Sequence, residues 1–373
     1  MNLSFAYTHS PIEFYFRQSP RDFVVEEVPL YPFNGDGMHL VLKIRKKNLT
    51  TFELLKILSN HLGIKEKDIG YAGLKDKNAL TIQHISLPYF IKDKLENFIH
   101  PDIKILDSNL HHNKIKIGHL KGNKFFLRVK KLSPLNAQKI VQAVESIKKF
   151  GVPNYFSYQR FGADGRNYLQ GREIVEKKRR LRDRKMHNFL ISAYQSYLFN
   201  LWLSMRIDIS HIIASYDIKE ISKALELYLQ TNDIPACFKE SMFCNKIKSQ
   251  KHPFKLLEGD MLCHYPYGKH FFLESMEKES LRFLQKDIAP TGLLSGKKAM
   301  FALGCAEFFE KKFLDSNILS IGQRRYAWVF PQDLEFFYKE QEAQGEFSFF
   351  LPKGAYATNL LREIAHREIK EEE

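Results

Sequence analysis

A run of basic residues interrupts the apolar pattern of this chain near its middle. Between residues 172 and 185, eight lysine and arginine side chains oppose three acidic ones, a net charge of +5 over fourteen residues. Such a run is typical of a solvated boundary, and it fits an exposed helix face or linker as well as a contact with RNA. The chain has 373 residues, more than one hydrophobic core usually supports, so we expect two domains.

The composition is that of a folded, basic protein. Hydrophobic residues make up 44% and aromatic residues 13% of the chain, which is ample material for a core. Lys and Arg outnumber Asp and Glu by 57 to 43, a net charge of +14, which indicates nucleic acid first and an anionic membrane surface second. The chain has no apolar stretch of the length of a membrane span and no secretory leader, so we expect a cytoplasmic protein.

The four cysteines show no zinc-binding or redox spacing. Cys237, Cys244, Cys263 and Cys305 form no C-x-x-C pair, and none belongs to a Cys/His ligand set. We therefore expect reduced, mostly packed thiols and no metal site.

The first third of the chain alternates strand and helix patterns. Over residues 39–46, Leu40, Leu42 and Ile44 fall on one face, and Lys43 and Arg45 fall on the other with His39 and Val41, which predicts a half-buried strand. Thr50 and Glu53 then fit a capping box, and apolar residues at helical spacing, beginning with Phe52, run to Gly63. This part of the chain is therefore expected to be mixed α and β.

Further elements follow along the chain. Two strands over 114–120 and 124–132 are expected to be joined by a turn at residues 121–123. Ser133 and Pro134 predict a helix start, and the helix has a buried stripe of Ile140, Val141, Val144 and Ile147. Three more elements are expected: a helix over 189–205, a strand over 347–351 and a helix from about residue 358.

Three segments combine glycine, polar and aromatic residues without the periodicity of a core element: residues 70–83, 152–162 and 351–363. In the first, Asp76 lies between Lys75 and Lys77 after a glycine-containing turn. Flanking cations favour an ionised carboxylate, as a nucleophile or base requires. An ordinary turn aspartate in a solvated charge run explains the same tripeptide, so the tripeptide alone proves little.

The second and third segments carry side chains typical of RNA recognition. Asn154 can read a base edge, Phe156 can stack on a base, and Arg160 can bind phosphate. A buried loop with core aromatics and capping amides is equally compatible. Tyr356 lies beside Gly354 near an expected helix start, where backbone amides can receive an anion, but a packed ring at that corner is as good an explanation.

In this order and at these separations, the segments resemble the TruD family of tRNA pseudouridine synthases. The motifs that carry the resemblance are PRDFVVEE from Pro20, AGLKDKNALT from Ala72, NYFSYQRFG from Asn154 and LPKGAYAT from Leu351. Residues 118–123 also resemble a hairpin of the family. Any one motif would be weak, whereas all of them in order make a strong signal.

The resemblance implies an α+β fold with a mixed, largely antiparallel, pseudouridine-synthase-like sheet flanked by helices. It implies a catalytic domain formed by residues 1–178 and 327–373, split by an inserted, family-specific α/β domain at 179–326. The implied reaction is the isomerisation of uridine to pseudouridine, usually at uridine 13 of certain tRNAs. The implied partner is tRNA; we expect no membrane or protein partner, and a monomer.

The resemblance also implies the roles of individual residues. Asp76 matches the catalytic aspartate of the family, and Phe23, Asn154 and Tyr356 match positions around the target nucleotide. Arg17 falls where members carry a basic residue, and we expect it to pair with Asp76. With Phe156 and Arg160, these residues form the predicted site.

The reaction itself requires little from a cofactor. It breaks the bond from N1 to C1′ and joins C5 to C1′, without a change in oxidation state, so neither a redox cofactor nor ATP nor a metal is expected. A carboxylate suffices if it adds covalently or deprotonates the sugar. The alternative is a non-catalytic RNA-binding or RNA-folding protein; the combination of Asp76, Asn154 and a basic partner favours the enzyme.

Overall fold

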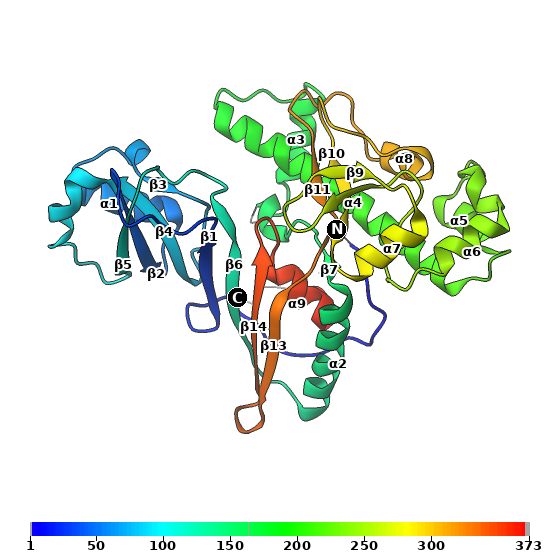
Figure 1. The fold of residues 1–373 in the computed structure, drawn as a ribbon, viewed down its shortest axis with the longest axis horizontal. Helices are drawn as coiled ribbons and strands as arrows, with labels where there is room; N and C mark the ends of the chain where they lie inside the picture. Colours follow the sequence, from blue (N-terminus) through cyan, green and yellow to red (C-terminus); the bar gives the residue numbers. More distant parts are fainter. Residues whose placement is uncertain (1, 163, 370–373) are drawn as a thin grey trace. The chain divides into compact units, whose positions relative to one another are not determined.

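The computed structural model describes residues 2–162 and 164–369 (Figure 1). The chain forms two compact units. Of the described residues, the sheet unit takes 12–145, 331–357 and 368–369, and the helix-rich unit takes 2–11, 146–162, 164–330 and 358–367.

The sheet unit is built on one eight-stranded sheet. Only β1 and β4 pair in parallel among its ladders, and the other neighbours are antiparallel, as predicted for a mixed, largely antiparallel sheet. In spatial order the strands are β13 (Gln332–Lys339), β14 (Gln344–Pro352), β6 (Leu120–Val129), β1 (Phe23–Pro29), β4 (Leu80–Pro88), β2 (His39–Lys46) and β5 (Ile103–His111), with β3 (Gly70–Tyr71) paired to β4.

Helix α1 (Thr51–Leu62) packs on this sheet, as Figure 1 shows, and forms as predicted. The capping box is present, with reciprocal hydrogen bonds between Thr50 and Glu53, and Gly63 ends the helix in the left-handed conformation with φ of 66°. The prediction that Phe52 is buried is wrong. Its side chain is 56% exposed, because the leucines of the helix fill the contact with the strands.

Strand β2 has the predicted bounds but is buried more deeply than expected. Val41, placed on the polar face by the alternation, is buried against a small apolar cluster on that face. The cluster exists because the segments around β3 and β6 cover this part of the second face; its buried members are Val41, Ala72, Ile115 and Leu120.

The predicted turn at residues 121–123 is wrong. These residues lie inside β6, which pairs with β1 on one side and β14 on the other, and no strand forms over 114–119 in this described stretch. Glycine at position 122 lets β14 lie close to β6 and does not form a turn. A Cβ at this position would lie 2.1 Å from the carbonyl oxygen of Leu351. The glycine therefore marks a crowded position in a central strand.

The helix-rich unit contains a four-stranded sheet and a two-stranded one. The first has the order β11 (Gln323–Tyr326), β10 (Ile288–Leu294), β8 (Met261–His264) and β9 (His270–Phe272), and the second pairs β7 (Val152–Pro153) with β12 (Trp328–Val329). Its helices include α3 (Asn167–Val175), α4 (Arg184–Ser215), α5 (Ile221–Leu229), α6 (Ser241–Lys248), α7 (Met276–Leu284) and α8 (Gly304–Lys311).

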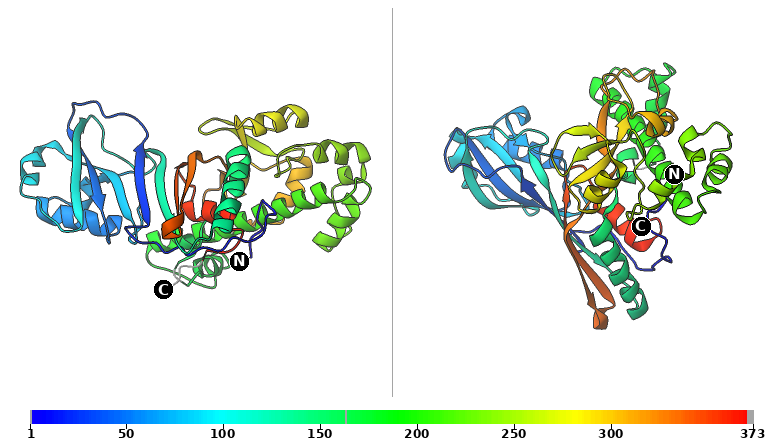
Figure 2. Two further views of the ribbon diagram at one scale, coloured as in Figure 1. Left: turned by 90° about the horizontal axis from the view of Figure 1, so that it is seen from below. Right: turned by 45° about the vertical axis from the view of Figure 1, so that its right-hand side comes forward.

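Helix α4 organises this unit and is seen along its length in Figure 2. The predicted helix over 189–205 is confirmed and extends at both ends to 32 residues. Trp202 packs so closely on β10 that a Cβ at Gly292 would lie 2.2 Å from its ring. Arg206, 1% exposed, forms a bidentate ion pair with Asp260 at 2.7 and 2.9 Å, which offsets the cost of burying both charges.

Two helices cross the boundary between the units in sequence. Helix α2 (Pro134–Phe150) confirms the expected helix and its Ser133 cap, although Val141 is 49% exposed instead of buried.

The strand expected over 347–351 is confirmed as part of β14, and the helix expected from about residue 358 is confirmed as α9 (Ala357–Ala365).

The compact units divide the chain at other points than the predicted insert at 179–326. Compactness alone does not decide which part of a chain is an insertion, so the insert stays a prediction.

Candidate active site

The loop that carries Asp76 connects β3 to β4 in the sheet unit. Asp76 is exposed, whereas the preceding Lys75 is buried, with 8% of its surface exposed. The backbone N–H of Lys75 donates to the hydroxyl of Thr51 at 2.9 Å, which ties the loop to the first turn of α1. The loop thus presents one carboxylate outward from a fixed backbone.

Lys75 forms a buried ion pair with Glu27 of β1. Its Nζ lies 2.9 Å from Glu27 Oε2, and both side chains are at most 5% exposed. Burial acts to raise the pKa of Glu27, but hydrogen bonding from His84 and the charge of Lys75 outweigh it, so the pKa lies below its ordinary value. Glu27 is therefore a fixed anion that anchors the loop through Lys75.

Lys46, the last residue of β2, supports the same loop from its other side. Its side chain is 1% exposed, and its Nζ donates to the backbone carbonyls of Leu49 at 2.5 Å and Asp76 at 3.1 Å. Burial lowers the pKa of Lys46 to about 8, although the negative charge of Asp76 acts to raise it. This ammonium group joins the strand end to the backbone of Asp76.

The cations around Asp76 differ from those expected. Lys75 turns inward to Glu27, and Lys77 pairs on the surface with Glu53 at 3.2 Å. The flanking lysines are thus each paired with another carboxylate, and the structure adds Lys46 as a cation whose charge interacts with Asp76.

Three further predicted residues also lie in the sheet unit. Arg17 is exposed in the segment before β1, and its pairing with Asp76 stays a prediction. Phe23 is 3% exposed, and its ring meets Phe125 at 6.2 Å between centroids, so its surface is already covered by another ring. Tyr356 lies partly exposed in the connection from β14 to α9.

The helix-rich unit holds the other predicted residues, gathered around Asn154. The Asn154 side chain donates from Nδ2 to the carbonyl of Tyr326 at 2.9 Å. Its Oδ1 accepts from Arg325 Nη2 at 2.9 Å, and its own carbonyl accepts from Arg325 Nε at 3.2 Å and Nη2 at 3.1 Å. Asn154 is thus held in one orientation by β11, and it is buried, with 4% of its surface exposed.

Arg325 also stacks on Phe156. The guanidinium carbon lies 3.9 Å from the Phe156 ring centroid and 5.5 Å from that of Phe199. The backbone of Phe156 is fixed by Asn200 of α4, which accepts from its N–H at 2.8 Å and donates to its carbonyl at 2.9 Å. Asn154, Phe156 and Arg325 therefore form one cluster.

Arg160 follows this cluster and lies along α4. It donates to the hydroxyls of Ser192 and Ser196, the latter at 3.4 Å, and its guanidinium carbon lies 5.3 Å from the Phe189 ring. The predicted phosphate-binding arginine is thus oriented by one face of a helix.

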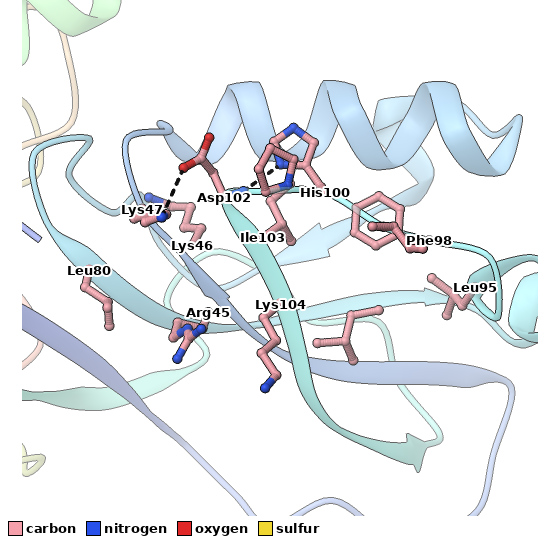
Figure 3. A pocket seen from close by; sticks show the side chains of 13 residues that line it. Arg45, Lys46, Lys47, Leu80, Leu95, Phe98, His100, Asp102, Ile103 and Lys104 are labelled. Carbon is pink, nitrogen blue, oxygen red and sulfur yellow. Dashed lines mark hydrogen bonds and ion pairs between the residues drawn. The ribbon is translucent and has the colours of Figure 1, made fainter.

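A cavity of about 680 Å³ opens elsewhere in the sheet unit (Figure 3). Its one acidic lining residue, Asp102, lies 3.8 Å from Lys47 Nζ, so the lining is basic overall. The predicted site residues do not line it, and Lys46 connects its wall to the Asp76 loop. The lining residues are Arg45, Lys46, Lys47, Leu80, Leu95, Phe98, Ile99, His100, Pro101, Asp102, Ile103, Lys104 and Ile105.

The described residues offer no cluster of three or more His, Cys, Asp or Glu side chains suited to a metal ion. The four cysteines are free thiols, three of them buried. None of the helices within residues 2–162 and 164–369 has both the length and the apolar surface needed to cross a membrane.

The sequence reasoning missed Lys46 and Arg325 as members of these clusters. Lys46 had a signal, since it continues the period-two spacing of the buried residues Leu40, Leu42 and Ile44. A lysine at such a position is unusual and points to a buried partner. Arg325 had none, because it meets Asn154 only through long-range folding.

The fold and the sequence place these clusters in a known class. A crystal structure described as the putative tRNA pseudouridine synthase D (TruD) from Methanosarcina mazei has the same fold, with a TM-score of 0.63 and 23% identity over 98% of this chain and 96% of that one. The family model of tRNA pseudouridine synthase D (TruD) matches residues 2–182 and 237–364.

Sequence relatives agree with this assignment. The tRNA pseudouridine synthase D of Wolinella succinogenes is 56% identical over 362 residues, 97% of each chain. That of Nitratiruptor sp. is 52% identical over 372 residues and 100% of each chain. The chain belongs to the TruD family.

Proposed function

We propose that this protein converts uridine to pseudouridine in tRNA, at uridine 13, with Asp76 as the catalytic carboxylate. One observation carries the assignment to Asp76. Its carboxylate is exposed, while the loop backbone beside it is held by two buried lysines, Lys75 and Lys46. A surface turn without a function has no need of such support, because burying each ammonium group is costly.

Membership of the TruD family makes the protein an isomerase that acts on uridine in tRNA. The basic composition, with a net charge of +14, suits an RNA substrate because phosphates attract cationic side chains and release counterions on binding.

The proposed chemistry starts at an ionised Asp76. The carboxylate either adds to the nucleoside or removes a proton from the sugar; the bond from N1 to C1′ then breaks. The uracil turns, C5 bonds to C1′, the hydrogen on C5 leaves as a proton, and N1 gains a proton. A carboxylate that has added to the nucleoside is released again in these steps, and one that has removed a sugar proton returns it. Electrons and atoms balance within the nucleotide, which is why this chemistry needs no cofactor.

The remaining predicted residues are proposed to bind the nucleotide. Asn154 is proposed to read the uracil edge; since it is 4% exposed and its amide already bonds to Tyr326 and Arg325, a neighbouring group has to move before a base reaches it. Tyr356, Phe23 and Phe156 are proposed to stack on bases. Flipping a nucleotide out of the RNA costs roughly a few kcal/mol, and stacking offsets part of that cost. Arg17 and Arg160 are proposed to bind the charged groups of the substrate.

Phe23 needs a change of surroundings to take this role. It is 3% exposed, so a base reaches its ring only if a neighbouring ring moves. For this reason Tyr356, which is partly exposed, is the better placed of the two.

The test is release of tritium from C5-labelled uridine in tRNA transcripts, with positions confirmed by mapping. Wild-type protein should release one equivalent from uridine 13, and Asp76→Asn should lower turnover by on the order of 10³-fold or more while tRNA affinity changes little. The chain supplies a matched control, because Lys92-Asp93-Lys94 repeats the tripeptide on an exposed 3-10 helix of the same unit.

The control separates a site effect from a charge effect. Asp93→Asn should retain wild-type turnover. If Asp76→Asn also retains it, the catalytic carboxylate lies elsewhere. If the wild-type protein binds tRNA but releases no tritium from any uridine, the enzyme assignment fails and an RNA-binding protein remains.

A further inference from the structure

The basic run detected in the sequence forms the connection between α3 and α4. We call residues 177–185 the basic segment. Its basic side chains outnumber its acidic ones. A neighbouring acidic side chain reduces the charge available to a ligand only if it forms an ion pair with one of these cations. The pairing of each acidic side chain therefore decides what the segment is able to bind.

The acids of the run are already engaged. Glu176 lies 2.7 Å from both Arg172 Nε and Lys178 Nζ, and Glu173 lies 3.4 Å from Arg179 Nη1. The third acid, Asp183, accepts from the backbone N–H groups of α4 as its N-cap. These carboxylates leave the other cations of the run unneutralised.

Five cations remain on the surface. All are exposed, and within the described part of the chain their side chains have no hydrogen bond or ion pair. They are Lys177, Arg180, Arg182, Arg184 and Lys185. Five unpaired charges within nine residues repel one another, so the segment is stabilised by a polyanion that neutralises them.

The segment is fixed rather than extended into solvent at random. The backbone N–H groups of Lys178 and Arg179 both donate to the carbonyl of Glu173, at 2.8 and 3.2 Å, which folds the segment back on α3. Leu181 packs on a buried cluster that includes Ile174 and Leu190. A fixed backbone reduces the entropy lost when a ligand binds.

The segment continues along one face of α4 toward the Asn154 cluster. Lys185, Phe189, Ser192, Ser196 and Asn200 recur at helical spacing, so they line one stripe of α4. Lys185 and Phe189 are exposed and Ser192 is half-buried, whereas Ser196 and Asn200 are buried, so only the start of the stripe is open to a ligand. Arg160 lies on the middle of this stripe, and Asn200 at its far end binds the backbone of Phe156. The accessible part, from Lys185 to Ser192, is about 10 Å long at 1.5 Å per residue.

We propose that the basic segment and the accessible start of this stripe, from Lys185 to Ser192, bind the phosphate backbone of the tRNA as one track that ends at Arg160. The proposal rests on the proposed function for the identity of the RNA. Phosphate contacts position an RNA without reading its sequence. The track therefore explains the affinity for the RNA and its position on the protein, and it does not explain which base is selected.

The experiment compares two triple variants that remove the same charge from the same unit. Arg180→Gln, Arg182→Gln and Lys185→Gln neutralise the segment, whereas Lys219→Gln, Lys223→Gln and Lys239→Gln neutralise exposed lysines on and near α5. Affinity for tRNA is measured by fluorescence anisotropy over a series of salt concentrations, and circular dichroism checks that both variants are folded.

The segment variant should bind about tenfold or more weakly at physiological salt, and the slope of log affinity against log salt should shrink by roughly two to three. The control variant should bind like the wild type. Equal weakening of both variants, or none in the segment variant, would overturn the track. Absence of pseudouridine formation by the wild type would instead overturn the proposed function and leave this binding comparison intact.

Discussion

The ammonium group of Lys46 donates to the backbone carbonyl of Asp76 at 3.1 Å from a side chain that is 1% exposed. A buried lysine that binds carbonyls is a costly way to close a loop, since its charge loses hydration. The geometry therefore links the position of Asp76 to the protonation of a second residue.

Lys46 should make stability depend on pH. In the folded chain its pKa is lowered to about 8 from the ordinary 10.5, so the unfolded chain binds more protons between these values. The wild type should therefore gain free energy of unfolding relative to Lys46→Met as the pH rises from about 8 to 10.5. Urea unfolding of both proteins across this range measures the difference, and a constant difference would contradict the buried charge.

The same substitution should affect turnover. Without the Nζ donor, the carbonyl of Asp76 loses its tie to β2, and misplacement of a reacting group by about 1 Å costs on the order of a hundredfold. Lys46→Met should lower kcat between about tenfold and a hundredfold with a smaller effect on tRNA affinity. Single-turnover kinetics at saturating tRNA distinguish this from a binding defect.

The buried pair of Glu27 and Lys75 should be worth far more than the exposed pair beside it. Glu27→Gln leaves an ammonium group buried without a counter-ion and should lower the free energy of unfolding by about 3–5 kcal/mol. Glu26 pairs with Lys43 at 2.7 Å but is about a third exposed, so Glu26→Gln should cost less than about 1 kcal/mol. Equal losses in the two variants would show that burial does not govern the pair.

The contribution of the Glu27–Lys75 pair to the free energy of unfolding also depends on pH. The pKa of Glu27 is lowered on folding, so its stabilising contribution is complete above the ordinary value of 4.5 and is lost as the pH falls through the folded value. The wild type should lose stability relative to Glu27→Gln in acid below 4.5, and acid titration of both proteins checks this.

Arg325 should not tolerate lysine. Its planar group donates to both oxygens of Asn154 and stacks on Phe156, and a lysine cannot do both at once. Arg325→Lys should lower kcat/KM by about tenfold or more because Asn154 loses its fixed orientation. Arg166→Lys, at an exposed arginine of the same unit, serves as the control and should leave kcat/KM unchanged.

Local patterns predicted the elements whose causes are local. The capping box of α1 and the alternation of β2 act within a few residues, so their bounds were found from the sequence. The burial of Val41 and the exposure of Phe52 depend on what packs on each face, which a single segment does not encode. Hydrophobic periodicity indicates which face of a strand or helix is buried most. It does not reveal that a second face is also covered by other segments.

The candidate site divides in the same way. A tripeptide of lysine, aspartate and lysine occurs at both 75–77 and 92–94, so its letters alone do not mark a site. What differs is the support for the first one, which comes from Glu27 on β1 and Lys46 on β2, far away in sequence. Only the fold brings those residues together, and only family resemblance singled out Asp76 beforehand.

Gly122 is the residue where local and long-range causes conflict most directly. Its sequence neighbours suggest a turn, yet it lies in β6 between two partner strands. An alanine there would place its Cβ 2.1 Å from the Leu351 carbonyl oxygen and 2.5 Å from the Phe350 ring, and the backbone cannot retreat without breaking the pairing with β14. Gly122→Ala should therefore lower the free energy of unfolding by about 2 kcal/mol or more.

Gly73 supplies the comparison for this prediction. It lies in the Asp76 loop, and its nearest neighbour to an added Cβ is Lys75 Nζ at 3.8 Å, an ordinary contact. Gly73→Ala should change the free energy of unfolding by less than about 1 kcal/mol, since only backbone entropy is affected. Urea unfolding of the two variants side by side decides the matter: if Gly122→Ala is as stable as Gly73→Ala, residues 121–123 have room to turn and the pairing of β6 with β14 is not what the structure shows.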